Sequence, residues 1–118
     1  MKSTKVWPIM HIIAMQKHIV DEHPWIARNL YNAFLESKRR SLERLLDPAV
    51  SRYPIPWLTN YARRTSEAFD GDPFPYGIEA NRPTLELFLR YCHEQGIAHR
   101  LATPEEIFPP GIMAPVRI

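Results

Sequence analysis

The fold of this chain is decided by the segment Tyr76-Gly-Ile-Glu-Ala-Asn-Arg-Pro-Thr-Leu-Glu-Leu-Phe-Leu-Arg-Tyr-Cys-His-Glu-Gln-Gly96, which reads as a loop, a helix start, an apolar helix and a helix stop. Pro83 suits the first helical position, because the N–H that proline lacks is not needed there. Gly96 suits the left-handed conformation that ends many helices. One apolar face recurs at helical spacing between them and consists of Leu85, Phe88, Leu89 and Cys92. The segment therefore predicts a helix from Pro83 to Gln95.

Further helices are predicted on both sides of this segment, most of them bounded by proline. They cover Lys17–Glu22, Pro24–Leu46, Pro56–Phe69 and Thr103–Phe108. The long one ends at Asp47 because Pro48 disfavours helical geometry in the residue before it. In the last one, Thr103 is an N-cap followed by proline and two acidic residues. A mostly helical chain is therefore expected, with extended or disordered ends at about residues 1–7 and 109–118.

A short apolar stretch from Ile9 to Met15 is rich in β-branched residues and predicts a buried strand that carries His11. A buried helix is the alternative, because periodicity does not separate the two over so few residues. A lone strand leaves a row of unpaired backbone N–H and C=O groups, which are costly to bury. The strand therefore requires a missing part of the same protein, a second copy of the chain, or the segment Lys5 to Pro8. A partner outside the chain is expected.

Composition bounds the chain to one small globular domain: it has 118 residues, of which 45% are hydrophobic and 24% charged. The net charge of +2 is too small to indicate a nucleic-acid partner. The cluster Lys38-Arg39-Arg40 is surrounded by acidic residues, which is typical of a solvated helix face. Cys92 is the single cysteine, so no internal disulfide forms. No apolar run is long enough to span a bilayer and no signal region opens the chain, so a cytoplasmic protein is expected.

Three residues are candidates for chemistry or binding. A histidine side chain can donate or accept a proton, so His11 is a candidate proton donor, with a satisfied core histidine as the alternative. Arg82 stands beside the aromatic loop and is a candidate anion-binding residue, with a surface salt bridge as the alternative. Tyr76 is a candidate lining residue of a ligand cleft, with a proline-braced loop packed on helices as the alternative. No zinc motif, nucleophile elbow or glycine-rich phosphate loop occurs, so no metal or cofactor is expected.

Three blocks of the chain resemble the 4,5-dihydroxyphthalate decarboxylase family. The first is Pro8-Ile-Met-His-Ile-Ile-Ala-Met15 together with His23-Pro-Trp-Ile-Ala27. The second runs from Phe74 to Gly96, and the third is Pro104-Glu-Glu-Ile-Phe108. The helical blocks are also similar to SsuA-like ABC-transporter solute-binding proteins, whereas the Pro-Ile-Met-His block favours the decarboxylases.

The resemblance implies an α/β fold of the type II solute-binding-protein class, two-lobed, with this chain as a mostly α-helical C-terminal portion carrying one or two strands. It implies a carboxy-lyase that converts an aromatic dicarboxylic acid to a dihydroxybenzoate, with His11 as proton donor or substrate contact. The alternative is a ligand-binding module for transport, without catalysis. The expected partners are a small aromatic carboxylate and either the missing N-terminal lobes or a second copy of the chain. About the first two thirds of a typical member are absent, so this chain is expected to be incomplete as an enzyme when it is alone.

Overall fold

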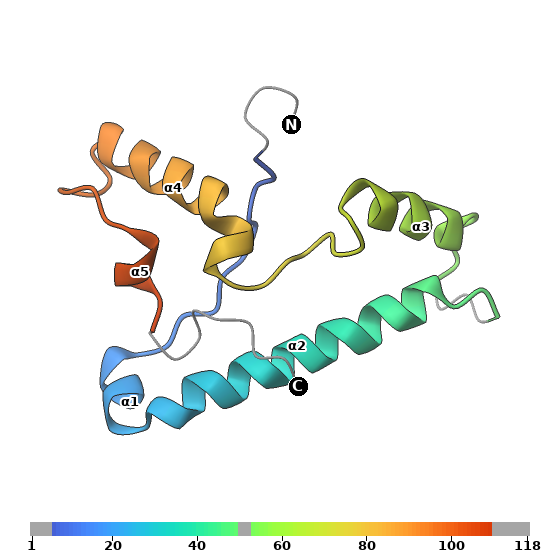
Figure 1. Ribbon diagram of the computed structural model, residues 1–118, viewed down its shortest axis with the longest axis horizontal. Coiled ribbons are helices and arrows are strands. Elements are labelled where there is room, and N and C mark those ends of the chain that lie inside the picture. The colour runs from blue at the N-terminus through green and yellow to red at the C-terminus, as the bar shows by residue number, and fades with distance from the viewer. Residues whose placement is uncertain (1–5, 50–52, 110–118) are drawn as a thin grey trace. The chain divides into compact units, whose positions relative to one another are not determined.

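The computed structural model describes residues 6–49 and 53–109, and within them it contains five α-helices and no strand (Figure 1). The helices are α1 (Lys17–Glu22), α2 (Pro24–Leu46), α3 (Leu58–Ala68), α4 (Ile78–Glu94) and α5 (Pro104–Ile107). The chain divides into two compact units. The first combines Met1–Asn29 with Tyr76–Ile118, and the second is Leu30–Pro75. No helix among the described residues is long and apolar enough to cross a membrane.

The predicted helices are confirmed, and two of them have the predicted ends. Helices α1 and α2 begin and end at the residues that the sequence indicates. Helix α3 is shorter than its prediction by two residues at the start and by one at the end. In α5 the backbone N–H of Thr103 donates to the Glu106 carboxylate over 2.6 Å, so the predicted cap forms as a capping box.

The predicted start of α4 is wrong. The helix begins at Ile78, and Pro83 lies inside it rather than at its first position. The reason is tertiary, because Ile78 is the most deeply buried hydrophobic side chain among the described residues, with 3% of its surface exposed. The Asn81 side-chain amide also donates to the Gly77 carbonyl over 2.9 Å and closes the first turn. Burial and this hydrogen bond outweigh the tendency of Pro83 to start the helix.

The predicted end of α4 at Gly96 is confirmed in detail. Gly96 has a φ of 73°, in the left-handed region. Its N–H donates to the His93 carbonyl over 3.1 Å, and the N–H of Ile97 donates to the Cys92 carbonyl over 2.8 Å. These two bonds form a Schellman motif, which satisfies carbonyls that a helix end otherwise leaves open.

The predicted strand at Ile9–Met15 is absent from the structure. Residues 6–16 form neither strand nor helix, so the alternative helix is absent too. The side chains are also not buried, since 83% of the Met10 surface is exposed. A strand needs a second backbone beside it, and no strand among the described residues supplies one. Residues 1–5 and 110–118 lie outside the described residues, so the predictions for the chain ends and for Lys5 as part of a pairing segment stay predictions.

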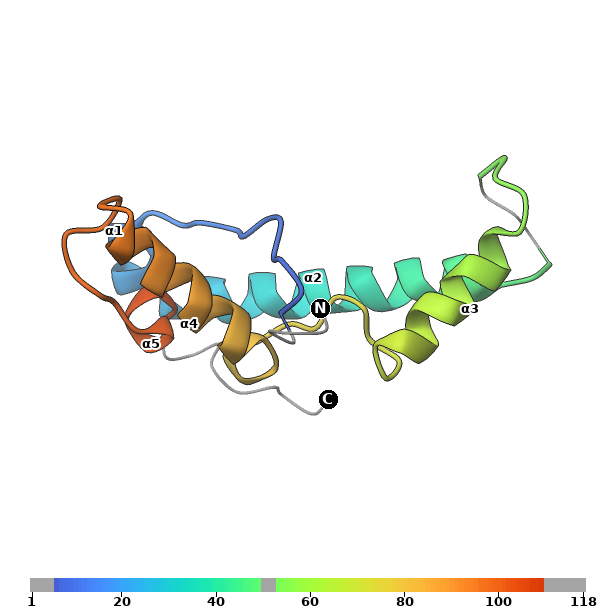
Figure 2. The same ribbon diagram turned by 90° about the horizontal axis from the view of Figure 1, so that it is seen from above.

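The first unit is built around α4 and α5, which lie side by side in both views (Figures 1 and 2). Its buried side chains include apolar residues one or two turns apart on α4, which are Ile78, Leu85 and Leu89. Pro104, the first residue of α5, is buried as well. The Thr84 hydroxyl donates to the Trp7 carbonyl over 3.3 Å and holds the N-terminal segment to α4.

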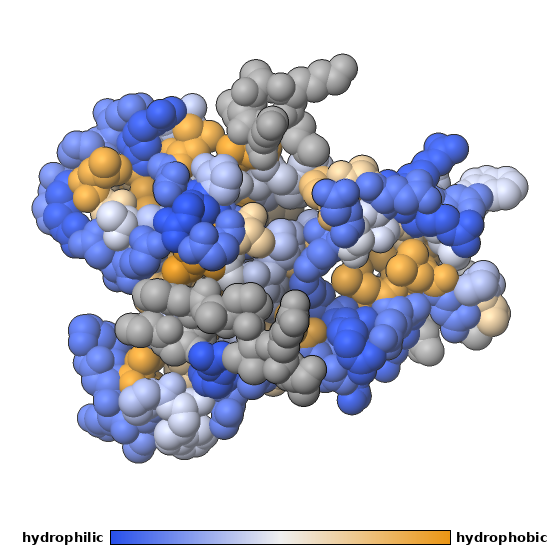
Figure 3. All heavy atoms as spheres, viewed as in Figure 1, coloured by the Kyte–Doolittle hydropathy of each residue, from blue (hydrophilic) through white to orange (hydrophobic). Residues whose placement is uncertain are grey.

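The second unit contains most of α2, all of α3 and the loops beside them. Its loop from Asp72 to Phe74 is fixed by Lys38, whose ammonium group lies 2.7 Å from the Asp72 carboxylate and 3.0 Å from the Phe74 carbonyl oxygen. Much of its apolar surface stays exposed, and Figure 3 shows hydrophobic atoms on the visible face around α3 as well as around α4.

Candidate functional site

His11 lies in the irregular segment that precedes α1, and its side chain is exposed. Within the described part of the chain it has no hydrogen bond and no ion pair. A general acid is normally held by neighbouring groups that fix its orientation. The groups that would orient His11 are therefore not supplied by the residues that the structure describes, and its catalytic role stays a prediction.

Arg82 lies in the second turn of α4 and forms ion pairs with three carboxylates. Its guanidinium lies 2.6 Å from Glu79, 2.5 Å from Glu105 and 3.5 Å from Glu86. The pKa values of Glu79 and Glu105 fall below the ordinary value, chiefly because each carboxylate accepts a hydrogen bond from Arg82. Those hydrogen bonds also raise the pKa of Arg82. Arg82 joins α4 to α5 through Glu105. This arrangement is the surface salt bridge that was given as the alternative to anion binding.

The aromatic loop is divided between the two units. Tyr76 belongs to the unit that contains α4, and 37% of its surface is exposed. Phe74 belongs to the other unit and is exposed as well. The structure therefore does not bring His11, Arg82 and Tyr76 into one site by any contact that it records, and Tyr76 as a ligand contact stays a prediction.

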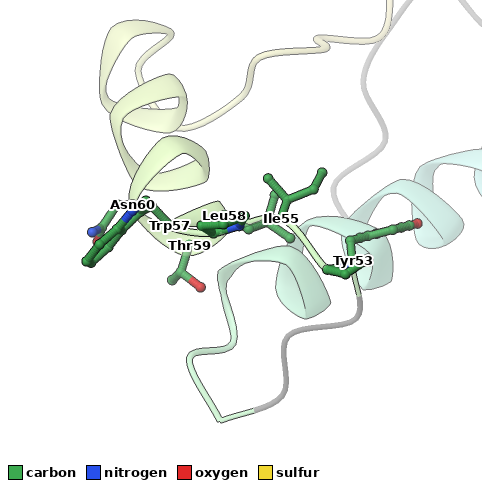
Figure 4. A pocket seen from close by; sticks show the side chains of 8 residues that line it. Tyr53, Ile55, Trp57, Leu58, Thr59 and Asn60 are labelled. Carbon is green, nitrogen blue, oxygen red and sulfur yellow. The ribbon is translucent and has the colours of Figure 1, made fainter.

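An open hollow in the second unit is formed by the residues that precede and begin α3 (Figure 4). Its lining consists of eight consecutive residues, Tyr53 to Asn60. Ligand pockets are usually enclosed by groups that converge from several elements. This hollow is the inner side of a single turn of chain, and it does not form a ligand cleft by itself.

Arg28 on α2 is a functional candidate that the sequence analysis missed. Its Nη1 atom is buried and has no hydrogen-bond partner in the described residues, and the same holds for Oδ1 of Asn32. The sequence contains a signal that Arg28 has no ion-pair partner on its own helix. Three and four residues before Arg28 stand Trp25 and Pro24, and three and four residues after it stand Tyr31 and Asn32. An arginine without an acidic neighbour at these helical spacings lacks an intrahelical ion pair.

No metal site is recorded in residues 6–49 and 53–109, since no three side chains of histidine, cysteine, aspartate or glutamate gather there.

Comparison with known proteins identifies one similar sequence over nearly the whole chain. No family model matches. The chain is 30% identical over 114 residues to the 4,5-dihydroxyphthalate decarboxylase of Comamonas testosteroni. The match covers 97% of this chain and 34% of that protein, and it falls on the C-terminal part of the decarboxylase. The resemblance read from the sequence is thereby confirmed. The chain spans about a third of the length of the curated relative that it matches, and this partial similarity supports a related function.

Proposed function

Because the chain is related to the C-terminal part of a 4,5-dihydroxyphthalate decarboxylase, we propose that it acts as the C-terminal portion of an aromatic-acid decarboxylase. The observation that carries this proposal is the similarity over 97% of the chain, at 30% identity. The reaction is the non-oxidative loss of one carboxylate from an aromatic dicarboxylic acid, which leaves a dihydroxybenzoate.

The proposed fold is the α/β type II solute-binding-protein class, in which this chain contributes helices to a larger two-lobed protein. The segment Ile9–Met15 supports this, because its apolar side chains are consecutive rather than alternating. A strand of that composition is covered on both faces of a sheet. In the present chain Met10, Ile12 and Ile13 are largely exposed. We expect this segment to become a strand when the remaining two thirds of the protein supply the neighbouring backbone.

The chemistry requires one proton and a path for two electrons. When the bond between the ring carbon and the carboxylate breaks, carbon dioxide leaves and the electron pair stays on the ring carbon. A proton donor must then form the new C–H bond, and positive groups must hold the remaining carboxylate. His11 is the proposed proton donor, because it lies within the segment that is expected to join the sheet and a histidine side chain can donate a proton.

The test measures carbon dioxide release from 4,5-dihydroxyphthalate. The purified chain is assayed alone and together with a separately expressed polypeptide that corresponds to the preceding two thirds of the Comamonas relative. We expect turnover in the mixture, a loss of at least about 100-fold with His11→Ala, and an unchanged rate with His99→Ala, which removes an exposed histidine elsewhere.

One result would contradict the proposed reaction, and another would contradict only the role of His11. Saturable binding of the phthalate without carbon dioxide release, in the chain alone and in the mixture, would favour a binding module for transport. An unchanged rate with His11→Ala would remove His11 from the reaction while leaving the decarboxylase assignment in place.

A further inference from the structure

The guanidinium of the half-buried Arg28 contains one nitrogen that is buried without a hydrogen-bond partner among the described residues. Its Nη1 atom is shielded from solvent and has no hydrogen-bond partner in the described part of the chain. A buried donor that has no acceptor lowers stability, and buried polar groups in native proteins nearly always have a partner. The orphaned nitrogen is therefore a position at which a hydrogen-bond acceptor is missing.

Several other arginines of the described helices form ion pairs with nearby carboxylates, and Arg28 does not. Arg39 and Arg40 lie beside Glu36, and Arg90 lies 3.5 Å from Glu94. Arg82 has three carboxylate neighbours. Each of these pairs joins residues three or four positions apart, except for the contact from Arg82 to Glu105. Arg28 has no acidic residue at such spacings, so a carboxylate partner has to come from outside α2.

We propose that Arg28 binds a carboxylate group of the ligand; this rests on the proposed function, which requires a positive group for the carboxylate that stays on the ring. The planar guanidinium donates two parallel hydrogen bonds to a carboxylate, and this geometry is stronger and more specific than a contact to a lysine. The Nη1 atom of Arg28 is shielded from solvent. Shielding from water strengthens the ion pair at this position.

The test compares Arg28→Met with Arg63→Met by thermal unfolding, with and without phthalate. Both variants remove one positive charge and keep a long side chain, and Arg63 is exposed on α3. Without phthalate we expect Arg28→Met to unfold at a higher temperature than the wild type, because it removes a buried donor that has no acceptor. Phthalate is expected to raise the unfolding temperature of the wild type and of Arg63→Met. The affinity of Arg28→Met for phthalate is expected to fall by at least about tenfold.

Three outcomes would overturn the assignment. The first is a lower unfolding temperature of Arg28→Met without phthalate, which is expected if Arg28 bonds the Asn32 side chain one turn away. The second is an equal phthalate shift in both variants, and the third is no phthalate shift in the wild type. Arg28-dependent binding without carbon dioxide release would instead keep the carboxylate site and contradict the decarboxylase function.

Discussion

The two units of the chain differ in how each one is stabilised internally. The unit with α4 and α5 has a small core of aliphatic side chains, in which Ile78, Leu85 and Leu89 are buried. In the unit Leu30–Pro75, the buried residues among those described are Ala62 and Pro73, whose side chains are small. Its large apolar residues, Phe34, Tyr53, Ile55, Trp57 and Tyr61 among them, are exposed.

The difference indicates how each unit responds to change. Burial of apolar surface is the main stabilising contribution in folded proteins. A unit that buries little of it relies on its few polar contacts and opens more easily. We therefore expect the first unit to depend on its core and the second on the contacts of Lys38 and on its loop geometry.

The largest effect is expected at the core of the first unit. Ile78→Ala removes most of a side chain that is 3% exposed, so the free energy of unfolding is expected to fall by about 2–5 kcal/mol. Urea unfolding followed by circular dichroism measures this. Ile97→Ala, at an exposed isoleucine in the same unit, is the matched control. Equal losses in the two variants would show that α4 is not anchored through Ile78.

The second effect is expected at the polar contact of the other unit. Lys38 is only 14% exposed and bonds both Asp72 and the Phe74 carbonyl, so Lys38→Met is expected to cost about 1–2 kcal/mol. Hydrogen exchange of the amides from Phe69 to Phe74 is expected to become faster. Lys17→Met removes an exposed i,i+4 pair and should leave exchange unchanged. Equal exchange rates in both variants would show that Lys38 does not stabilise this loop.

Gly96 occupies a left-handed position in the first unit, with a φ of 73°. Gly96→Ala is expected to lower the free energy of unfolding by about 1 kcal/mol, because a Cβ disfavours that conformation. No atom outside the adjacent residues lies within 4 Å of the added Cβ, so the cost is conformational and not steric. Chemical denaturation measures this change in the free energy of unfolding. No change in Gly96→Ala would show that the left-handed conformation at the end of α4 does not require glycine.

Trp57, the N-cap residue of α3, occupies a left-handed position in the second unit, with a φ of 64°. Its side chain is 73% exposed, so Trp57→Gly removes little packing and relieves the backbone. The free energy of unfolding is expected to rise by about 0.5–1 kcal/mol. Trp57→Ala, which keeps a Cβ, should show no such gain. A loss of stability with glycine would mean that the indole ring packs against the chain.

The smallest effect is expected from Glu36 on α2, which pairs with Arg39 and Arg40 three and four residues later. The pKa of Glu36 is lowered to about 2, mainly by hydrogen bonds from Arg39 and then from Arg40. A carboxylate with a lowered folded-state pKa stabilises the chain above its ordinary value of 4.5, and this contribution is lost as the pH falls to about 2. The unfolding temperature of Glu36→Gln should therefore fall less over that pH range than that of the wild type. Parallel curves would exclude this contribution.

Several features follow from residues close together in the sequence. The ends of α1 and α2, the glycine that closes α4 and the cap of α5 were all predictable. Each depends on a turn or cap that spans only a few residues. Even Arg28 had a local signal, because the absence of acidic residues one turn away is visible in the sequence.

The sequence by itself determined where most of the helices lie, since the hydrogen bonds and caps of a helix join residues a few positions apart. Only the tertiary structure decided that α4 starts before Pro83, that Ile9–Met15 forms no strand and that a nitrogen of Arg28 is buried without a partner. Burial, strand pairing and the partners of a buried charge depend on residues that are distant in the chain or outside it, and local sequence patterns do not specify them.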